Sequence, residues 1–354
     1  MATTPKICIN GAGRLGREII RQLVAASTVG EELFLINDSR MSASQLVYLL
    51  KYDSIYLGRN NPFYDEGHTL DADPNDNYIA IDGKQYPFEH KTDVSQLPLA
   101  QLSINTVIEC SGAFKTQGLL QPFLNAGASH VICPYLIADT TIPIYVDGVN
   151  TIGSTSIYSL GNPEIIALSN ILKPINDNYG VVSVNTNALL CYNNTMNLMD
   201  YPTTTNTNLL NYNKAAAQNM IPSNSKVPFK AVSRVIQELN DNKMTGNLCY
   251  TGVPFGNLLY ITIKTQNSAT MEGINALIKS STSSASWDKF STGLVYVDED
   301  LITPIDVCGN KAQVLYLVPY SAAATEENTF TLVCTYDATA SLAAYALFMA
   351  EKYI

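Results

Sequence analysis

Short apolar runs alternate with amphipathic stretches along the first 150 residues. Four of these runs predict buried strands, at residues 6–10, 33–38, 105–110 and 130–134. After the first run, apolar side chains recur at the spacing of one helix face, at Leu15, Ile19, Ile20 and Leu23. A second helix is predicted over residues 42–53. Strands that alternate with helices, without an internal repeat, indicate an α/β domain with a doubly wound parallel sheet.

The pattern changes near residue 151. One helix is predicted over residues 163–178, and longer runs of alternating apolar and polar positions follow at 181–190 and 257–265. These features predict a second, α+β domain with a mixed or antiparallel sheet and helices on one face. Residues 193–213 are rich in Asn and Thr and are predicted to form a long loop.

The chain closes with another helical pattern, whose apolar stripe consists of Leu342, Tyr345, Ala346 and Met349. We expect this helix to dock on the first domain. The predicted division is therefore a Rossmann-like domain of residues 1–150, completed by the C-terminal helix 336–354, and a second domain of residues 151–335.

The charge balance restricts the class of partner. Charged residues make up 15% of the 354 residues, and the net charge is −10. This charge argues against a nucleic acid or an anionic membrane surface as the main partner, because both repel an acidic protein.

The cysteines and the N-terminus bear on the compartment. Seven scattered cysteines without a C-x-x-C pair predict buried, reduced thiols and no metal site. A strand is predicted from about residue 6, which leaves no room for a signal peptide before it, and no apolar run is long enough to span a membrane. The predicted compartment is the cytoplasm.

The strongest local motif is G-x-G-x-x-G at Gly11, Gly13 and Gly16, between a predicted strand and a predicted helix. The first glycine permits a tight turn, the second lets a pyrophosphate approach the backbone, and the third lets helix and strand pack closely. Asp38 ends the second strand, where a carboxylate accepts hydrogen bonds from the adenosine ribose and favours NAD over NADP; Arg40 weakens that preference. The alternative is a loop that only packs.

At this point the sequence resembles the glyceraldehyde-3-phosphate dehydrogenase family. Residues 6–17 are similar to its first strand and dinucleotide loop, 33–54 to its second strand and following helix, and 107–114 to its turn near the nicotinamide. Further similar stretches follow in order at 127–134, 145–150, 176–182, 214–222, 230–239 and 244–246. The resemblance implies a Rossmann NAD-binding domain and a catalytic domain. It implies these NAD contacts: Asn10, Gly11, Gly13, Arg14, Leu15, Gly16, Asp38, Ser111 and Gly112.

The family's nucleophile and base have no counterpart in this chain. Counting back without gaps from residues 176–180, the family's catalytic Cys aligns with Pro163, and its catalytic His aligns with Leu190. Asn162, Pro163 and Glu164 instead make a good helix start. Glu164 could be proposed as a new nucleophile, but an acid in a first helical turn is usually only a stabiliser. Cys191 could be proposed as a displaced nucleophile, but a buried inert thiol is the expectation.

The substrate contacts of the family are also replaced. Its phosphate-binding arginine aligns with Tyr250 or Gly252, and Arg234 is the single arginine after Arg59. The Asn that orients the nicotinamide amide aligns with Ala338.

Three functions fit these observations. The first is an inactive, dehydrogenase-like structural or regulatory subunit that binds NAD or nothing. The second is an NAD-dependent oxidoreductase with altered chemistry. The third is a sensor of NAD(H) or of an adenine nucleotide. We favour the first, because the second domain offers no convincing acid or base. A homo-oligomer or a larger assembly is predicted, held by the sheet of the second domain and by loop 193–213. The loop supplies these apolar anchors: Leu198, Met199, Leu209, Leu210 and Tyr212. The alternative is that these side chains fold back on their own subunit.

Overall fold

The computed structural model describes residues 4–56, 61–65, 67–151, 153–202, 210–225, 227–240, 242–282 and 292–352. These residues form two compact units. The first contains the chain up to Asn162 and the C-terminal stretch from Thr339, and the second contains the residues between Pro163 and Ala338.

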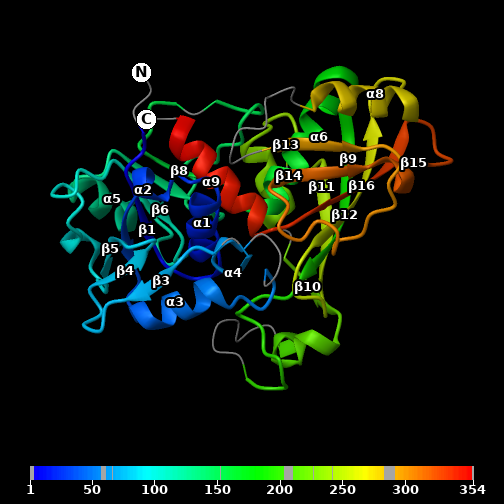
Figure 1. Ribbon diagram of the computed structural model, residues 1–354. Coiled ribbons are helices and arrows are strands. Elements are labelled where there is room, and N and C mark those ends of the chain that lie inside the picture. The colour runs from blue at the N-terminus through cyan, green and yellow to red at the C-terminus, as the bar shows by residue number, and fades with distance from the viewer. Residues whose placement is uncertain are drawn as a thin grey trace. The chain divides into compact units, whose positions relative to one another are not determined.

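The sheet of the first unit has the strand order β3-β4-β5-β2-β1-β6-β7-β8 (Figure 1). The pairs β5–β2, β2–β1, β1–β6, β6–β7 and β7–β8 are parallel, whereas β3, β4 and β5 pair with one another as antiparallel neighbours. Because β2 and β6 flank β1 on opposite sides, the order reverses at β1, as in doubly wound folds. The predicted parallel sheet is confirmed. Its strands are β1 (Ile7–Asn10), β2 (Leu33–Asn37), β3 (Leu70–Ala72), β4 (Tyr78–Ile81), β5 (Lys84–Glu89), β6 (Thr106–Glu109), β7 (His130–Cys133) and β8 (Ile157–Ser159).

Helices cover both faces of this sheet. Cys8 packs in one apolar cluster with Leu120 and Phe123 of α5, whereas Ile9 lies against Gly16 of α1. Because neighbouring strand residues point to opposite faces, α5 and α1 lie on opposite sides of the sheet. The helices are α1 (Arg14–Ala25), α2 (Val29–Glu32), α3 (Ala43–Lys51), α4 (Pro62–Asp65), α5 (Gln117–Asn125) and α9 (Ala340–Lys352), with a 3-10 turn η1 (Val94–Gln96).

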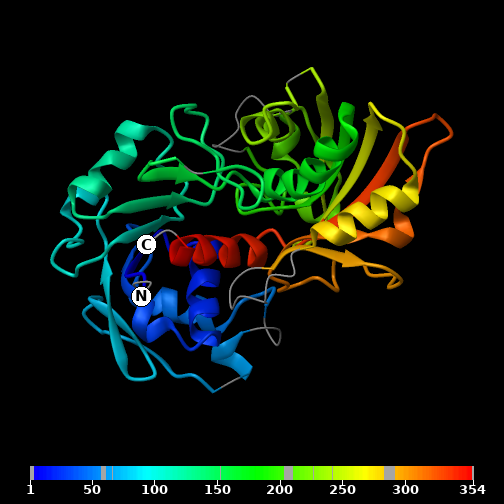
Figure 2. The ribbon, with the colours of Figure 1, turned by 90° about the horizontal axis from the view of Figure 1, so that it is seen from above.

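Helix α9 packs beside α1, as Figure 2 shows for the red and blue helices. Gln22 of α1 donates a hydrogen bond to the carbonyl of Ala340 at 2.9 Å. The backbone N–H of Asp147 donates to the hydroxyl of Tyr345 at 2.6 Å. The stripe residues Leu342, Tyr345, Ala346 and Met349 are all buried. One buried and one partly buried hydrogen bond therefore hold a helix that comes from the far end of the chain.

The division between the units differs from the predicted one. Strand β8 pairs with β7 in parallel, with Val131 opposite Ile157, and so belongs to the first sheet. The first unit continues to Asn162, and the predicted boundary at residue 150 is too early for this reason. At the C-terminal end, the last strand of the second unit runs to Tyr336, so the return to the first unit comes at Thr339 instead of residue 336.

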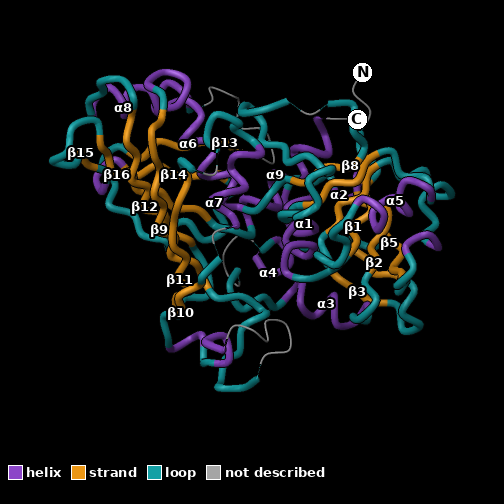
Figure 3. The backbone as a smooth tube through the Cα atoms, turned by 180° about the vertical axis from the view of Figure 1, so that it is seen from behind, coloured by secondary structure: helices purple, strands orange, loops and turns teal. Residues whose placement is uncertain are grey.

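The second unit has a mixed sheet of order β10-β11-β9-β12-β16-β14-β13, with β15 paired to β16 (Figure 3). β9–β11 and β13–β14 are parallel, and the other pairs are antiparallel, which confirms the predicted mixed sheet. Its strands are β9 (Val181–Cys191), β10 (Ile221–Ser223), β11 (Met244–Thr251), β12 (Asn257–Thr265), β13 (Thr292–Val297), β14 (Ala312–Leu317), β15 (Ala322–Ala323) and β16 (Thr329–Tyr336).

The helices of this unit are α6 (Pro163–Tyr179), α7 (Val227–Ala231) and α8 (Met271–Ser281), with 3-10 turns η2 (Leu210–Asn213), η3 (Ala216–Gln218), η4 (Val232–Arg234) and η5 (Val318–Tyr320). Along β9, Val184, Thr186, Ala188 and Leu190 are buried in alternation with more exposed residues. This alternation is typical of a sheet that has only one face covered.

The described part of loop 193–213 folds back on its own unit in part. Tyr212 packs edge-on against Tyr250, 5.9 Å between ring centroids, in a small apolar cluster with Met196 and Ile221. Tyr212 is therefore buried, and its prediction as an exposed anchor is wrong. Met199 and Leu210 remain 78% and 74% exposed, and Leu198 is exposed as well. The remaining predicted anchor, Leu209, lies outside the described residues.

All seven cysteines are free thiols. Cys8, Cys133, Cys308 and Cys334 are buried as predicted, but Cys110, Cys191 and Cys249 are only half-buried. In the described ranges, no group of three or more His, Cys, Asp and Glu is placed to hold a metal ion. No helix among the described residues combines the length and the apolar character needed to cross a membrane.

Candidate functional site

The glycine-rich loop lies between β1 and α1, at the carboxyl edge of the sheet where the strand order reverses. Gly11 has φ +97°, and a Cβ at this position would lie 2.6 Å from the backbone nitrogen of Ser111. A Cβ on Gly16 would lie 2.1 Å from the carbonyl oxygen of Gly11. Both positions therefore require glycine. At Gly13 nothing lies within 4 Å of a built Cβ, so this part of the backbone faces open space.

A buried polar network connects the ends of three strands beneath the loop. Asn37 donates to Asn10 at 2.6 Å, and Asn10 donates to the Glu109 carboxylate. The other oxygen of Glu109 accepts from the N–H and the hydroxyl of Ser111, at 2.7 and 2.6 Å, and from the N–H of Gly112 at 3.0 Å. Burial raises the pKa of Glu109, although these hydrogen bonds oppose the shift. The network gives the Ser111–Gly112 turn its shape.

The Asp38 carboxylate also shapes the loop. Its Oδ2 accepts from the N–H of Ala12 at 2.8 Å, and its Oδ1 accepts from the N–H groups of Arg40 and Met41, at 2.9 and 3.2 Å. A carboxylate has about four acceptor positions, so roughly one remains for a ligand hydroxyl. The side chain is half-buried and thus in reach of solvent. Asp38 can therefore position the loop and accept a hydroxyl at the same time.

Arginines gather at the start of α1. The Arg14 guanidinium lies over the Tyr56 ring, 5.9 Å from the centroid, and Arg17 donates to the carbonyl of Ala12 at 3.1 Å. Burial lowers the pKa of Arg17, and repulsion from Arg21 lowers it further by a smaller amount. Positive charge next to a helix N-terminus favours a bound anion. Leu15, next to Arg14, is half-buried.

The structure thus brings the predicted cofactor residues to one edge of the sheet: Asn10, Gly11, Gly13, Arg14, Leu15, Gly16, Asp38, Ser111 and Gly112. Sequence reasoning missed Arg17, Asn37 and Glu109. Each of three buried strands ends in a polar residue, and the carboxyl ends of parallel strands meet at one edge of the sheet. This pattern could have predicted that the polar side chains lie together.

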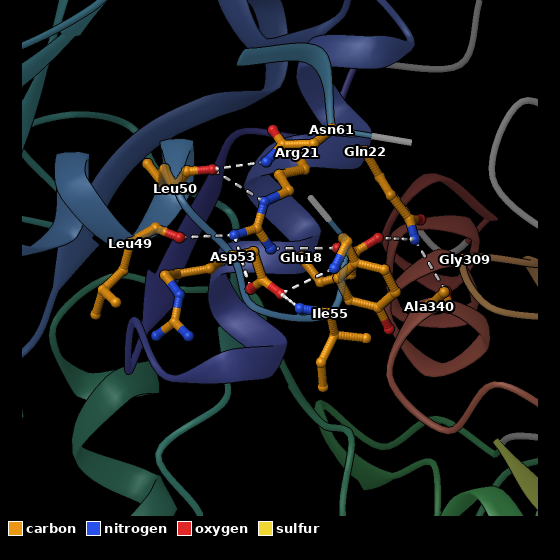
Figure 4. Close-up of polar contacts among 12 residues, drawn as sticks. Glu18, Arg21, Gln22, Leu49, Leu50, Asp53, Ile55, Asn61, Gly309 and Ala340 are labelled. Atoms are coloured by element: carbon orange, nitrogen blue, oxygen red, sulfur yellow. Dashed lines mark hydrogen bonds and ion pairs between the residues drawn. The ribbon is translucent and has the colours of Figure 1, made fainter. Parts of the chain in front are cut away.

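A second buried cluster anchors α1 around Arg21 (Figure 4). Arg21, which is 1% exposed, contacts the carboxylates of Asp53 at 3.1 Å and Glu18 at 3.4 Å. It also donates to the carbonyls of Leu49 at 2.8 Å and Leu50 at 3.2 Å. The cluster ties α1 to the end of α3.

The Asp53 carboxylate has further partners in the next turn. It accepts from the N–H groups of Ile55 and Tyr56, at 2.9 and 3.1 Å. Burial would raise the pKa of Asp53, but Arg21 and these two N–H groups outweigh burial and lower it. The ionised form of Asp53 is therefore favoured in the folded protein.

In the second unit, Pro163 begins α6 and Glu164 lies in its first turn, as predicted. The Glu164 carboxyl is 7% exposed and accepts from the Tyr336 hydroxyl at 3.1 Å and from the Asn257 amide at 3.4 Å. Burial raises the pKa of Glu164. The side chain is therefore an interior hydrogen-bond acceptor in addition to its place at the helix start. Asn257 and Tyr336 are further residues that sequence reasoning missed.

The residues that the resemblance aligns with the family's base and phosphate-binding arginine are uncharged. Leu190 is buried on β9 opposite Tyr250 of β11. Cys191 is half-buried, and its N–H donates to the Asn257 side chain at 2.9 Å. Burial raises the pKa of Tyr250. A Cβ on Gly252 would lie 2.7 Å from the carbonyl oxygen of Ala217, so position 252 has no room for a side chain.

The last two predicted positions lie at the ends of elements. Arg234 ends the 3-10 turn η4, which directly follows helix α7. Ala338 follows β16 by two residues and is half-buried.

Comparison with known proteins covers most of the chain. Residues 5–117 match the family model for the NAD binding domain of glyceraldehyde 3-phosphate dehydrogenase, and residues 166–338 match the model for its C-terminal domain. Glyceraldehyde-3-phosphate dehydrogenase B of Aspergillus oryzae is 30% identical over 309 residues, 87% of this chain and 86% of the relative. The Mycolicibacterium smegmatis dehydrogenase is 31% identical over 282 residues, 78% and 79% of the two chains. The Colletotrichum lindemuthianum dehydrogenase is 29% identical over 335 residues, 94% and 92%.

Proposed function

The chain belongs to the glyceraldehyde-3-phosphate dehydrogenase family, and we propose that it is a member that has lost the family's reaction and serves as a structural or regulatory subunit. In this proposal the dinucleotide loop still binds NAD. The observation that carries the proposal is a contrast between the two units. The loop of the first unit keeps the features that a dinucleotide needs, whereas the aligned catalytic positions of the second unit are Pro163 and Leu190.

The chemistry of the second unit supports the loss of activity. Proline has no nucleophilic side chain, so the helix N-terminus that stabilises a thiolate in the family has no thiolate to stabilise. Leucine cannot exchange a proton, which removes the general base. The positions aligned with the phosphate-binding arginine are Tyr250 and Gly252, and neither supplies a cation.

The geometry of the first unit supports retained binding. Gly11 and Gly16 are packed so closely that only glycine fits, and the open space over Gly13 is where a pyrophosphate would approach. The arginines at the start of α1 place positive charge near that space. Asp38 retains an acceptor position for a ribose hydroxyl.

The binding test compares NAD with ADP-ribose. Ala338 lacks the amide that would hold the nicotinamide carboxamide, so we expect the two ligands to bind with similar affinity in calorimetry. Asp38→Asn should lower the affinity for both ligands. Asp71→Asn, which changes an exposed carboxylate of β3, should lower the affinity for neither. NAD binding more than about tenfold tighter than ADP-ribose, about 1.4 kcal/mol, would contradict this prediction. If neither ligand binds, the loop is only structural.

One observation favours the altered oxidoreductase as second candidate. The contact between Glu164 and Tyr336 is a pair of buried proton-holding groups in the second unit. The discriminating assay is NAD reduction with a panel of aldehydes in the absence of phosphate. Turnover that Glu164→Gln abolishes and that Glu272→Gln, on helix α8, leaves unchanged would favour this candidate over the inactive subunit.

Assembly is part of the proposed function. Exposed apolar side chains gather in the segment around loop 193–213, and a lone monomer would leave them in water: Leu198, Met199, Tyr201, Leu210 and Met220. The loop side chains are almost uncharged, so apolar contact is the expected mode of association. We propose a homo-oligomer or a stoichiometric subunit of a larger assembly, in the cytoplasm, where the free state of all seven cysteines is the normal one.

The assembly test changes two exposed residues together. Met199→Asp with Leu210→Asp should raise the dissociation constant of the assembly at least roughly tenfold, as for central interface side chains. Leu301→Asp, at a position 71% exposed elsewhere in the second unit, is the matched control. Light scattering after size exclusion measures the mass of each variant. A monomeric native protein that also co-purifies with no stable partner would count against the proposal.

A further inference from the structure

We propose that His90 is a positioning residue for the ribose-binding carboxylate of Asp38, and that it makes nucleotide binding tighter at lower pH. The inference rests on the proposed binding of an adenine dinucleotide by the first unit. No part of the sequence motif points to His90, which follows β5 and lies 52 positions beyond Asp38.

The contacts of the ring carry the inference. Nδ1 of His90 lies 3.2 Å from the backbone carbonyl oxygen of Asp38. Nε2 lies 3.1 Å from the backbone carbonyl oxygen of Asp76 and 3.1 Å from a carboxylate oxygen of the same residue. The ring stands edge-on to Phe88, with 4.7 Å between the centroids, which restricts its rotation. His90 therefore bridges the Asp38 segment to the turn between β3 and β4.

The turn on the far side of this bridge has its own fixed contacts. Asp76 has φ +65°, a left-handed conformation that costs free energy in a residue other than glycine and needs support from its surroundings. Its second carboxylate oxygen accepts from the N–H of Ala43 at the start of α3, and its N–H donates to Asp73. Asp76 is thus a fixed point against which His90 can hold the backbone of Asp38.

The protonation state of the ring decides how many of these contacts are hydrogen bonds. Acceptor oxygens face both ring nitrogens, but a neutral imidazole carries a single N–H and leaves one nitrogen lone pair directed at a carbonyl. The imidazolium donates on both sides and places a positive charge beside the Asp76 carboxylate. Histidine is the side chain whose charge ordinarily changes between pH 5 and 8. Protonation therefore strengthens the bridge, and deprotonation weakens it.

The other acidic groups near the ring, and Lys91, already have partners. Glu89 and Lys91 flank His90 on its own segment and pair with each other at 3.5 Å. Asp73 of the facing turn accepts from the side chain and the backbone of Asn77, and Asp38 directs its carboxylate to three backbone N–H groups. Arg40 lies exposed in the Asp38 segment. The net charge facing the ring is thus set mainly by Asp76.

The consequence for binding follows from the position of Asp38. Its carboxylate accepts from Arg40 and Met41, and its carbonyl accepts from His90, so loss of the bridge loosens the segment that carries the carboxylate. A looser segment must be ordered when the ribose binds, which costs conformational entropy and weakens affinity. The proton-bound protein is the better binder, and affinity therefore falls as the pH rises.

The test measures ADP-ribose affinity by calorimetry at pH 5.5, 6.5 and 8. We expect the native protein to bind roughly 3- to 10-fold more tightly at pH 5.5 than at pH 8. His90→Gln should bind with the same affinity throughout, since an amide has no charge to lose. His68→Gln is the matched control, because His68 is a histidine of the same unit whose ring contacts a different carboxylate, Asp82, at 2.6 Å. This variant should retain the native pH profile.

A second measurement does not depend on ligand. Hydrogen exchange of a peptide that covers Arg40 and Met41, corrected for the intrinsic effect of pH, should show protection that falls from pH 5.5 to pH 8 in the native protein but not in His90→Gln. A native affinity independent of pH, or a pH dependence kept by His90→Gln, overturns the inference. If the native protein binds no ADP-ribose at any pH, the proposed nucleotide binding fails. In that case the exchange experiment still tests His90: the same exchange protection in the native protein and in His90→Gln overturns its role as well.

Discussion

With glyceraldehyde 3-phosphate, NAD and phosphate, the protein is expected to show no turnover above a mock preparation. A general base alone contributes typically about 10²–10⁴-fold to a reaction rate, and the covalent route through a nucleophile is absent in addition. Formation of NADH followed by absorbance is the measurement, with an active family member as positive control. Turnover above background would refute the proposed inactivity.

Restoring the two catalytic side chains should not restore the activity. In Pro163→Cys with Leu190→His, the aligned nucleophile and base are back, but Tyr250 and Gly252 still offer no cation to the substrate phosphate. We expect at most a trace of turnover from this double variant. Pro163→Ala with Leu190→Gln changes the same positions without adding reactive groups and is its control. If the double variant turned over as fast as an active family enzyme, the phosphate contact would be dispensable.

Removal of Arg21 is expected to have the largest effect on stability. Arg21→Met leaves Glu18 and Asp53 buried without their cation, and breaking a buried ion pair on one side typically costs about 3–5 kcal/mol. Urea unfolding at pH 7, followed by circular dichroism, measures the change in the free energy of unfolding. Arg40→Met, which changes an exposed arginine, should alter it by less than about 0.5 kcal/mol. Combining Arg21→Met with Glu18→Gln and Asp53→Asn should recover much of the loss, because no buried charge then lacks a partner.

The pH dependence of this effect has a defined sign. The folded protein lowers the pKa of Asp53, so this carboxylate stabilises the fold above its unfolded pKa of about 3.9. The stabilisation is lost as the pH falls through the lower pKa of the folded state. The difference in stability between the native protein and Asp53→Asn should therefore be large at pH 7 and shrink below pH 4. A difference that stays constant down to pH 2 would mean that the ionisation of Asp53 does not contribute.

The sequence by itself determined the features that depend on local spacing. The glycine motif predicted the loop between β1 and α1, because the tight turn at Gly11 and the close helix contact at Gly16 require glycine, and Gly13 leaves the approach to the backbone open. The spacing of apolar residues predicted a parallel sheet in the first unit, a mixed sheet in the second, and the start of α6 at Pro163. The order of the motifs along the chain also predicts that the neutral residues Pro163 and Leu190 align with the family's catalytic positions.

Tertiary structure alone decided which distant side chains meet. Asn10 and Glu109 are 99 positions apart, and Glu164 and Tyr336 are 172 apart, so no periodicity within a single element could pair them. Strand β8 pairs with β7 and so belongs to the first sheet. For this reason the boundary between the two units lies at Asn162 and not at residue 150. The ring of Tyr212, in the 3-10 turn η2, is buried against Tyr250 of strand β11. Local sequence sets backbone conformation and the exposed face of an element, whereas the partner of a buried polar group depends on how separate elements pack.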